Sequence, residues 1–199
     1  AVIFLGGYDF LDFVPPSTLP CCGIDIDDSY NGILSPVSLD PFAAAKLATD
    51  YFRARNIRHV QIHRLEHGAL YENRAACFQH LWSKFGTHEE KLYLPWDLAN
   101  QQELLPDNPQ VGHFFTAGTW CDEKLKLWKA HYGTDAVQKL AIVSVDGKSL
   151  LVPGYEDVST IGIDWRSAGR VAIQEILRRL EYPSAEARRI YLIPKLHEI

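Results

Sequence analysis

The stretch Val158-Ser159-Thr160-Ile161-Gly162-Ile163-Asp164-Trp165-Arg166-Ser167-Ala168-Gly169-Arg170-Val171-Ala172 joins an apolar run to the start of a helix. Val158–Ile163 predicts a buried strand, and Ser167–Leu180 predicts the helix that follows it. Arg189–Ile193 is a further apolar segment and predicts another strand. A strand, a helix and a second strand in this order form the unit from which parallel sheets are built.

The same alternation of strands and helices runs through the rest of the chain. Asp40 followed by Pro41 is typical of a helix start, with an N-cap and a first-turn proline. Further helices are predicted over Glu72–Phe85 and near Asp122–His131. The other predicted strands are Ala1–Leu5, Pro20–Ile26, Ile57–His63, Lys91–Leu94, Val111–Thr116 and Leu140–Val145. We therefore predict an α/β fold in which helices cover parallel sheets.

The composition excludes several classes of protein. The chain has 199 residues, of which 47% are hydrophobic and 23% are charged, as in an ordinary globular domain and unlike a disordered chain. The formal net charge of −5 disfavours direct binding of nucleic acid, because such a surface needs Lys and Arg against the phosphates. No apolar run reaches the roughly 18 residues of a membrane span.

The sequence predicts no metal, no cofactor and no catalytic residues. The cysteines form no C-x-x-C pair and are expected to be reduced: Cys21, Cys22, Cys77 and Cys121. His59 and His63 alternate along one predicted strand, a spacing that can suit a metal, but no carboxylate partner is evident. The chain contains no G-x-S-x-G, P-loop, H-E-x-x-H or G-x-G-x-x-G motif.

Polar and aromatic side chains follow several of the predicted strands. The carboxyl ends of parallel strands meet at one edge of a sheet, where ligands bind. Carboxylates and guanidinium groups hydrogen-bond to sugar hydroxyls, and indole rings pack on the apolar face of a sugar ring. Each residue also has a structural interpretation: turn or cap for the aspartates, helix surface for the arginine, core for the tryptophans. The candidate ligand-binding residues are Asp27, Arg74, Trp96, Thr119, Trp120, Asp146 and Trp165.

Several segments resemble LacI/GalR-type transcription regulators. Ile161–Ala172 resembles the family's D-x-x-x-x-G-x-x-A helix start, and Arg188–Leu196 resembles its closing strand and P-x-L. Arg74–Phe78 resembles the family's R-x-x-G-F helix start, with Cys77 in place of glycine. Ile142–Gly147 resembles its V-V-G-F-D-D strand end. These landmarks follow the family order over nearly the whole chain.

The resemblance implies a type I periplasmic-binding-protein-like fold, with two Rossmann-like subdomains and a ligand cleft between them. Residues 1–40 would be the remainder of the N-terminal subdomain, and residues 41–163 mainly the C-terminal subdomain. Residues 164–199 would form the crossover back to the N-terminal subdomain and the C-terminal end. Family chains carry a helix-turn-helix domain and further βα units ahead of this region, so we expect an N-terminally truncated chain.

The resemblance also implies roles for five of the candidate residues. Arg74 would bind sugar hydroxyls in a bidentate manner, and Asp146 would accept hydrogen bonds from hydroxyls. Trp96 and Trp165 would stack on the sugar ring, and Asp27 would line the pocket.

One departure from the family pattern affects this site. The family has Asn-Asp after the strand that ends near Thr116, whereas this chain has Gly118-Thr119 and then Trp120. A hydroxyl-binding carboxylate is therefore missing, and an aromatic residue is added.

The implied protein is the effector-binding domain of a cytoplasmic bacterial transcription regulator, and not an enzyme. Its partners would be a small carbohydrate or related metabolite, a second copy in a homodimer, and DNA bound through the attached helix-turn-helix domain. One alternative is a solute-binding protein of a sugar transporter, which would carry a secretory signal. Another is an α/β enzyme using Asp146 and Arg74, although no nucleophile–base pair accompanies them.

Overall fold

The computed structural model describes residues 1–6, 19–26, 32–66, 68–93, 110–146 and 158–198, and the chain divides into two units, each with its own sheet. Unit 1 comprises Ala1–Asp40 and Ile163–Pro194. Unit 2 comprises Pro41–Gly162 and Lys195–Ile199. The chain therefore passes from one unit to the other three times. In the part of the chain that is described, no helix is long and apolar enough to cross a membrane.

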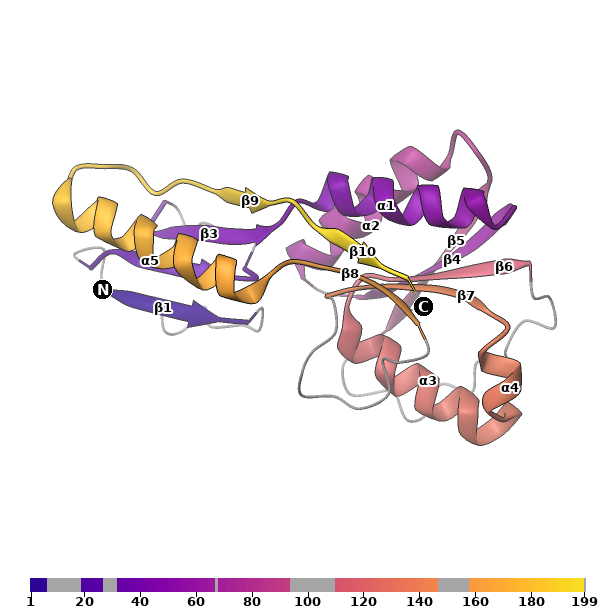
Figure 1. Cartoon of the computed structure of the whole chain (residues 1–199). Helices are drawn as coiled ribbons and strands as arrows, with labels where there is room; N and C mark the ends of the chain where they lie inside the picture. Colours follow the sequence, from indigo (N-terminus) through magenta and orange to yellow (C-terminus); the bar gives the residue numbers. More distant parts are fainter. Residues whose placement is uncertain (7–18, 27–31, 67, 94–109, 147–157, 199) are drawn as a thin grey trace. The chain divides into compact units, whose positions relative to one another are not determined.

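Unit 1 is a parallel sheet with a helix packed on it (Figure 1). The strands lie in the order β1 (Val2–Leu5), β2 (Cys21–Ile24), β3 (Leu34–Leu39) and β9 (Ile190–Leu192). Helix α5 (Trp165–Glu181) contacts β2 and β3. Its buried residues Ala168, Ala172 and Ile176 pack against Cys22, Ile24 and Val37 of the sheet. The small alanines let the helix approach the strands closely.

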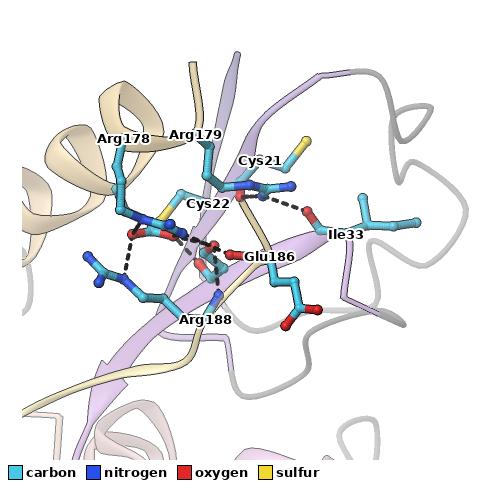
Figure 2. A network of polar contacts seen from close by, with 9 residues as sticks. Cys21, Cys22, Ile33, Arg178, Arg179, Glu186 and Arg188 are labelled. Atoms are coloured by element: carbon cyan, nitrogen blue, oxygen red, sulfur yellow. Dashed lines mark hydrogen bonds and ion pairs between the residues drawn. The ribbon is translucent and has the colours of Figure 1, made fainter. Parts of the chain in front are cut away.

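The buried carboxylate of Glu175 anchors α5 to the sheet and to the segment before β9. It accepts hydrogen bonds from Ser35 of β3 at 2.9 Å, from Arg188 at 2.7 Å, and from two nitrogens of Arg178 at 2.9 and 2.7 Å. Figure 2 shows Arg178 and Arg188 in this network, together with Arg179, which donates to the carbonyl oxygens of Cys21 and Ile33. Burial raises the pKa of Glu175, but the hydrogen bonds from Arg178, Ser35 and Arg188 outweigh it and hold the pKa below its usual value.

Unit 2 contains a sheet of six strands. Their order is β10 (Lys195–His197), β8 (Ser159–Gly162), β7 (Ala141–Val145), β6 (Val111–Phe115), β4 (His59–Leu65) and β5 (Thr87–Tyr93). All neighbours are parallel except β10, which runs antiparallel to β8. The two central strands β6 and β7 are buried along their whole length, which explains their near-continuous apolar sequences.

Helices cover both faces of this sheet, as Figure 1 shows. Helices α1 (Pro41–Ala54) and α2 (Ala69–Trp82) pack together on one face. There the rings of Phe52 and Phe114 both contact Phe78, at centroid distances of 5.9 and 4.3 Å. Helix α3 (Gly118–Tyr132) and the short α4 (Thr134–Val137) cover the other face. The predicted α/β class with parallel sheets is confirmed.

Some element boundaries differ from the prediction. Helix α2 begins three residues before Glu72, because Gly68 takes a positive φ of 128° that allows the helix to start there. Strand β5 is longer than Lys91–Leu94, and its exposed, charged residues hide it from a search for apolar runs. Strands β3 and β10 and helix α4 were not predicted.

Candidate functional site

The carboxyl edge of the unit 2 sheet brings two of the candidate residues together. Arg74 lies on α2, which follows β4, and Asp146 follows the last residue of β7. Arg74 Nη1 forms an ion pair with Asp146 Oδ1 at 2.8 Å. The same nitrogen donates to the carbonyl oxygen of Thr116, just beyond β6, at 2.8 Å. Three neighbouring strands therefore contribute to one polar cluster, as expected at this edge of a parallel sheet.

The backbone holds Asp146 in an uncommon conformation. Its φ is 86°, in the region that residues other than glycine rarely adopt. Its amide donates to the carbonyl oxygen of Ile161 at 2.8 Å, so β8 fixes the residue at the end of β7. Such backbone conformations cluster at binding sites, where they aim a side chain. Asp146 is also the more accessible member of the ion pair, with a side-chain exposure of 22% against 1% for Arg74.

Arg74 is the buried member of this ion pair. Burying a guanidinium group is costly unless its charge and its donors are satisfied. Asp146 supplies the charge, the Thr116 carbonyl accepts a hydrogen bond, and the ring of Tyr71 lies 5.9 Å from the guanidinium carbon. The geometry therefore makes Arg74 a support that orients the carboxylate of Asp146.

Thr119 and Trp120 lie next to this cluster in sequence, in the first turn of α3. Thr119 is exposed. Trp120 is only 6% exposed and belongs to the apolar cluster that includes Leu65, Tyr71 and Phe115. Its indole N–H has no hydrogen-bond acceptor among the described residues. Their contact with a ligand stays a prediction.

Of the three remaining candidates, the structure describes only Trp165. Trp165 is the first residue of α5, in unit 1, and is 44% exposed. Asp27 and Trp96 lie outside the described residues. Their roles also stay predictions.

Two buried histidines, His63 and His113, form a pair close to the site. This pair was not predicted from the sequence. His63 Nδ1 is 2.7 Å from the hydroxyl of Tyr93, and His63 Nε2 is 3.0 Å from His113 Nδ1. Phe115 stacks on His63 at 4.2 Å. The alternation of His59 and His63 was noted in the sequence, but strand order was needed to show that β6 brings His113 beside β4. Among the described residues, no group of three His, Cys, Asp or Glu side chains could hold a metal ion.

Burial keeps both imidazoles neutral. It lowers the pKa of His63 well below its usual value, and repulsion from His113, Lys124 and Lys91 adds to the effect. Burial, with a smaller contribution from His59, lowers the pKa of His113 to about 3. His63 also accepts two hydrogen bonds at its carbonyl oxygen from Thr116, at 3.0 and 3.2 Å. Because Thr116 holds Arg74, the histidine pair is part of the support of the candidate site.

Comparison with known proteins identifies the fold. No family model and no curated protein matches the chain. Among solved structures, a LacI transcriptional regulator from Lactobacillus brevis has a TM-score of 0.71 at 16% identity, over 98% of this chain and 77% of that chain. A LacI family transcriptional regulator from Enterococcus faecalis V583, with bound ribose, has a TM-score of 0.69 at 13% identity. A periplasmic binding protein/LacI transcriptional regulator from Alkaliphilus metalliredigens QYMF, complexed with D-xylulofuranose, gives the same two values. The last two matches each cover 98% of this chain and 75% of the other.

The chain therefore has the fold of periplasmic-binding-protein-like domains, as found in LacI regulators. The predicted fold class is confirmed at this level. Unit 1 and unit 2 are two parallel-sheet units of that fold.

Proposed function

We propose that this chain is the effector-binding part of a LacI-type transcription regulator, that its effector is a small carbohydrate, and that it is not an enzyme. The observation that carries the proposal is the ion pair of Arg74 and Asp146 at the carboxyl edge of the unit 2 sheet. Two structures of similar fold hold ribose and D-xylulofuranose, which supports a sugar as the ligand class.

Asp146 is the group that meets the sugar in this proposal. A carboxylate accepts hydrogen bonds from two adjacent hydroxyls, and a charged acceptor makes such bonds stronger. Arg74 pairs with the carboxylate and fixes its direction, so little side-chain entropy is lost on binding. No chemical step is needed for this role.

The regulatory step follows from linkage. A sugar that binds one conformation of the domain better than another shifts the population toward it, by no more than its difference in affinity. In the intact regulator this shift changes the affinity of a helix-turn-helix domain for DNA. We infer a cytoplasmic homodimer for the working protein.

Calorimetric titration of the purified domain with ribose and other pentoses and hexoses tests the proposal. We expect a saturable site for at least one neutral sugar. Asp146→Asn should weaken that binding by about tenfold or more, because a charge-assisted hydrogen bond of about 1.5–3 kcal/mol is lost. Asp122→Asn is the matched control, since Asp122 is a buried carboxylate of the same unit that pairs with Lys126 at 2.5 Å.

Two results would contradict the proposal. One is the absence of binding for every sugar by a folded domain. The other is equal weakening by Asp146→Asn and Asp122→Asn. Release of a modified sugar during the titration would instead favour an enzyme.

A further inference from the structure

A cavity of unit 2 lies at the opposite edge of the sheet from Asp146. Its volume is about 500 Å³, within the range of about 300–1,000 Å³ of small-molecule sites. It opens where β7 and β8 begin, below the last turn of α1. The lining residues are Tyr51, Arg55, Ile57, Gln138, Lys139, Leu140, Ala141, Ile142, Val158 and Ser159.

Arg55 is fixed at this cavity. Its guanidinium carbon lies 3.6 Å from the centroid of the Tyr51 ring. Its Nη1 donates to the Tyr51 carbonyl oxygen at 3.5 Å, which turns the other side of the guanidinium group outward. Stacking on an aromatic ring restricts the side chain before any ligand arrives, so less entropy is lost on binding.

A carboxylate of the chain itself already binds this guanidinium group. Glu198, just after β10, accepts from Arg55 Nη2 at 3.2 Å. Both side chains are partly open to solvent, at 35% for Arg55 and 54% for Glu198, so the pair is weak and exchangeable. Glu198 therefore shows that Arg55 binds a carboxylate at this position. Because the pair is weak, the carboxylate of a ligand can take the place of Glu198.

The rest of the lining defines the body of a ligand. Ile57, Leu140 and Val158 supply apolar surface, and the ring of Tyr51 lies under the Arg55 guanidinium group. Lys139 brings a second cation, and Gln138 brings an amide. The cavity thus combines a mostly polar, cationic wall with a smaller apolar part, which suits an anion that carries a compact apolar body.

We propose that this cavity binds a small organic carboxylate, with its carboxylate on Arg55 in place of Glu198 and its apolar body on the side chains around Tyr51. The site is separate from the sugar site and does not depend on the function proposed above. It gives unit 2 two ligand sites, one at each edge of its sheet.

Calorimetric titration of the whole chain with sodium benzoate, backed by amide shifts in NMR spectra, tests this site. Benzoate should bind and should shift the amides of Leu140 and Ser159. Arg55→Gln should weaken binding at least tenfold, whereas Glu198→Gln should tighten it several-fold because the competing carboxylate is removed. Arg53→Gln is the matched control: Arg53 lies two residues before Arg55, at the end of α1, above the ring of Phe85 at 4.1 Å, and is not among the residues that line the cavity.

Several outcomes would overturn the proposal. They are no binding of benzoate to either the native chain or the Glu198→Gln variant, equal binding of the neutral isostere benzyl alcohol, and equal weakening by Arg53→Gln and Arg55→Gln. Inorganic phosphate binding as tightly as benzoate would also overturn it, because the apolar lining would then contribute nothing. Sugar binding, measured on the same samples, should not change in the Arg55→Gln variant, so failure of one site is distinguishable from failure of the other.

Discussion

At the scale of single residues, the interior of unit 2 contains a pair of buried histidines, His63 and His113. Their imidazoles share one hydrogen bond, and the hydroxyl of Tyr93 extends the row to a third strand. Charged groups around them come from β5, as Lys91, and from α3, as Lys124. Because these neighbours are cations, a proton on His63 is opposed by both burial and charge, whereas a proton on His113 is opposed mainly by burial, with a contribution from His59.

This arrangement predicts that acid destabilises the fold. A histidine in the unfolded chain has a pKa of about 6.5, whereas burial keeps the native pKa of His63 and His113 lower. Below pH 6.5 the unfolded state therefore takes up protons that the native state does not, and stability falls as the pH decreases. For His113 this loss continues down to about pH 3. The slope is up to ~1.4 kcal/mol per pH unit for each imidazole.

Urea unfolding at pH 7.5, 6.0 and 5.0 measures this slope. The His113→Phe variant keeps a ring in the core but removes one titrating group, so its stability should depend less steeply on pH. An equal slope in both proteins would contradict the assignment of the effect to the buried pair. The exposed His131→Phe variant is the control.

In unit 1, the buried residue whose charge contributes to stability is Glu175. Replacing it with Gln removes the charge that Arg178 and Arg188 share, so Glu175→Gln should destabilise unit 1 by about 3 kcal/mol. Denaturant unfolding measures the loss. Glu181→Gln, at the exposed end of the same helix, should change stability by less than about 0.5 kcal/mol.

The start of α5 shows how one element is fixed at its end. Asp164 is the N-cap, and its carboxylate accepts from the Arg166 amide at 3.0 Å and from the Ser167 hydroxyl at 2.6 Å. These two hydrogen bonds lower the pKa of Asp164. Asp164→Ala should therefore lower the melting temperature, and Asp164→Asn should lower it less because an amide oxygen still caps the helix. Thermal melting of the two variants checks the order.

Other elements show what the sequence pattern can and cannot predict. Helix α1 is predicted well, because Asp40, Pro41 and a run of good helix formers agree. Strand β3 is hidden by Pro36, which usually argues against a central strand. The structure allows it because β9 pairs with β3 only from Val37 onward, so Pro36 lies opposite Gly23 on one side alone.

At the scale of the candidate site, strand ends could be predicted but their partners could not. Arg74 and Asp146 were both named from the rule that ligands bind beyond parallel strands, and they form an ion pair across 72 positions of sequence. The Thr116 carbonyl could not be named, because a backbone acceptor carries no signal in the sequence. Trp120 could not be assigned to core or ligand by residue type alone, because a tryptophan suits both.

At the scale of the whole molecule, the two units have separate cores, one around Ala168 and Ala172 and the other around Trp128 and Phe115. We expect them to respond separately to damage. Glu175→Gln should lower hydrogen-exchange protection in β2 and β3 while leaving β6 and β7 protected, because the disrupted contacts all lie in unit 1. Mass spectrometry of exchanged peptides measures this difference. Uniform loss of protection in all four strands would show a single cooperative core.

The chain crosses between its two units three times, and this also determines the order in which a ribosome can complete the two units. Strands β1, β2 and β3 emerge first, but α5 and β9 follow only after Pro41–Gly162 has been synthesised, a span of 122 residues. At about 5–20 residues per second, the first sheet waits roughly 6–24 s with its face of Cys22, Ile24 and Val37 uncovered. Unit 2 lacks only its last short strand by then. The nascent chain therefore presents an apolar sheet for seconds, and a ribosome-associated chaperone would find its binding surface on the strands that are made before unit 2.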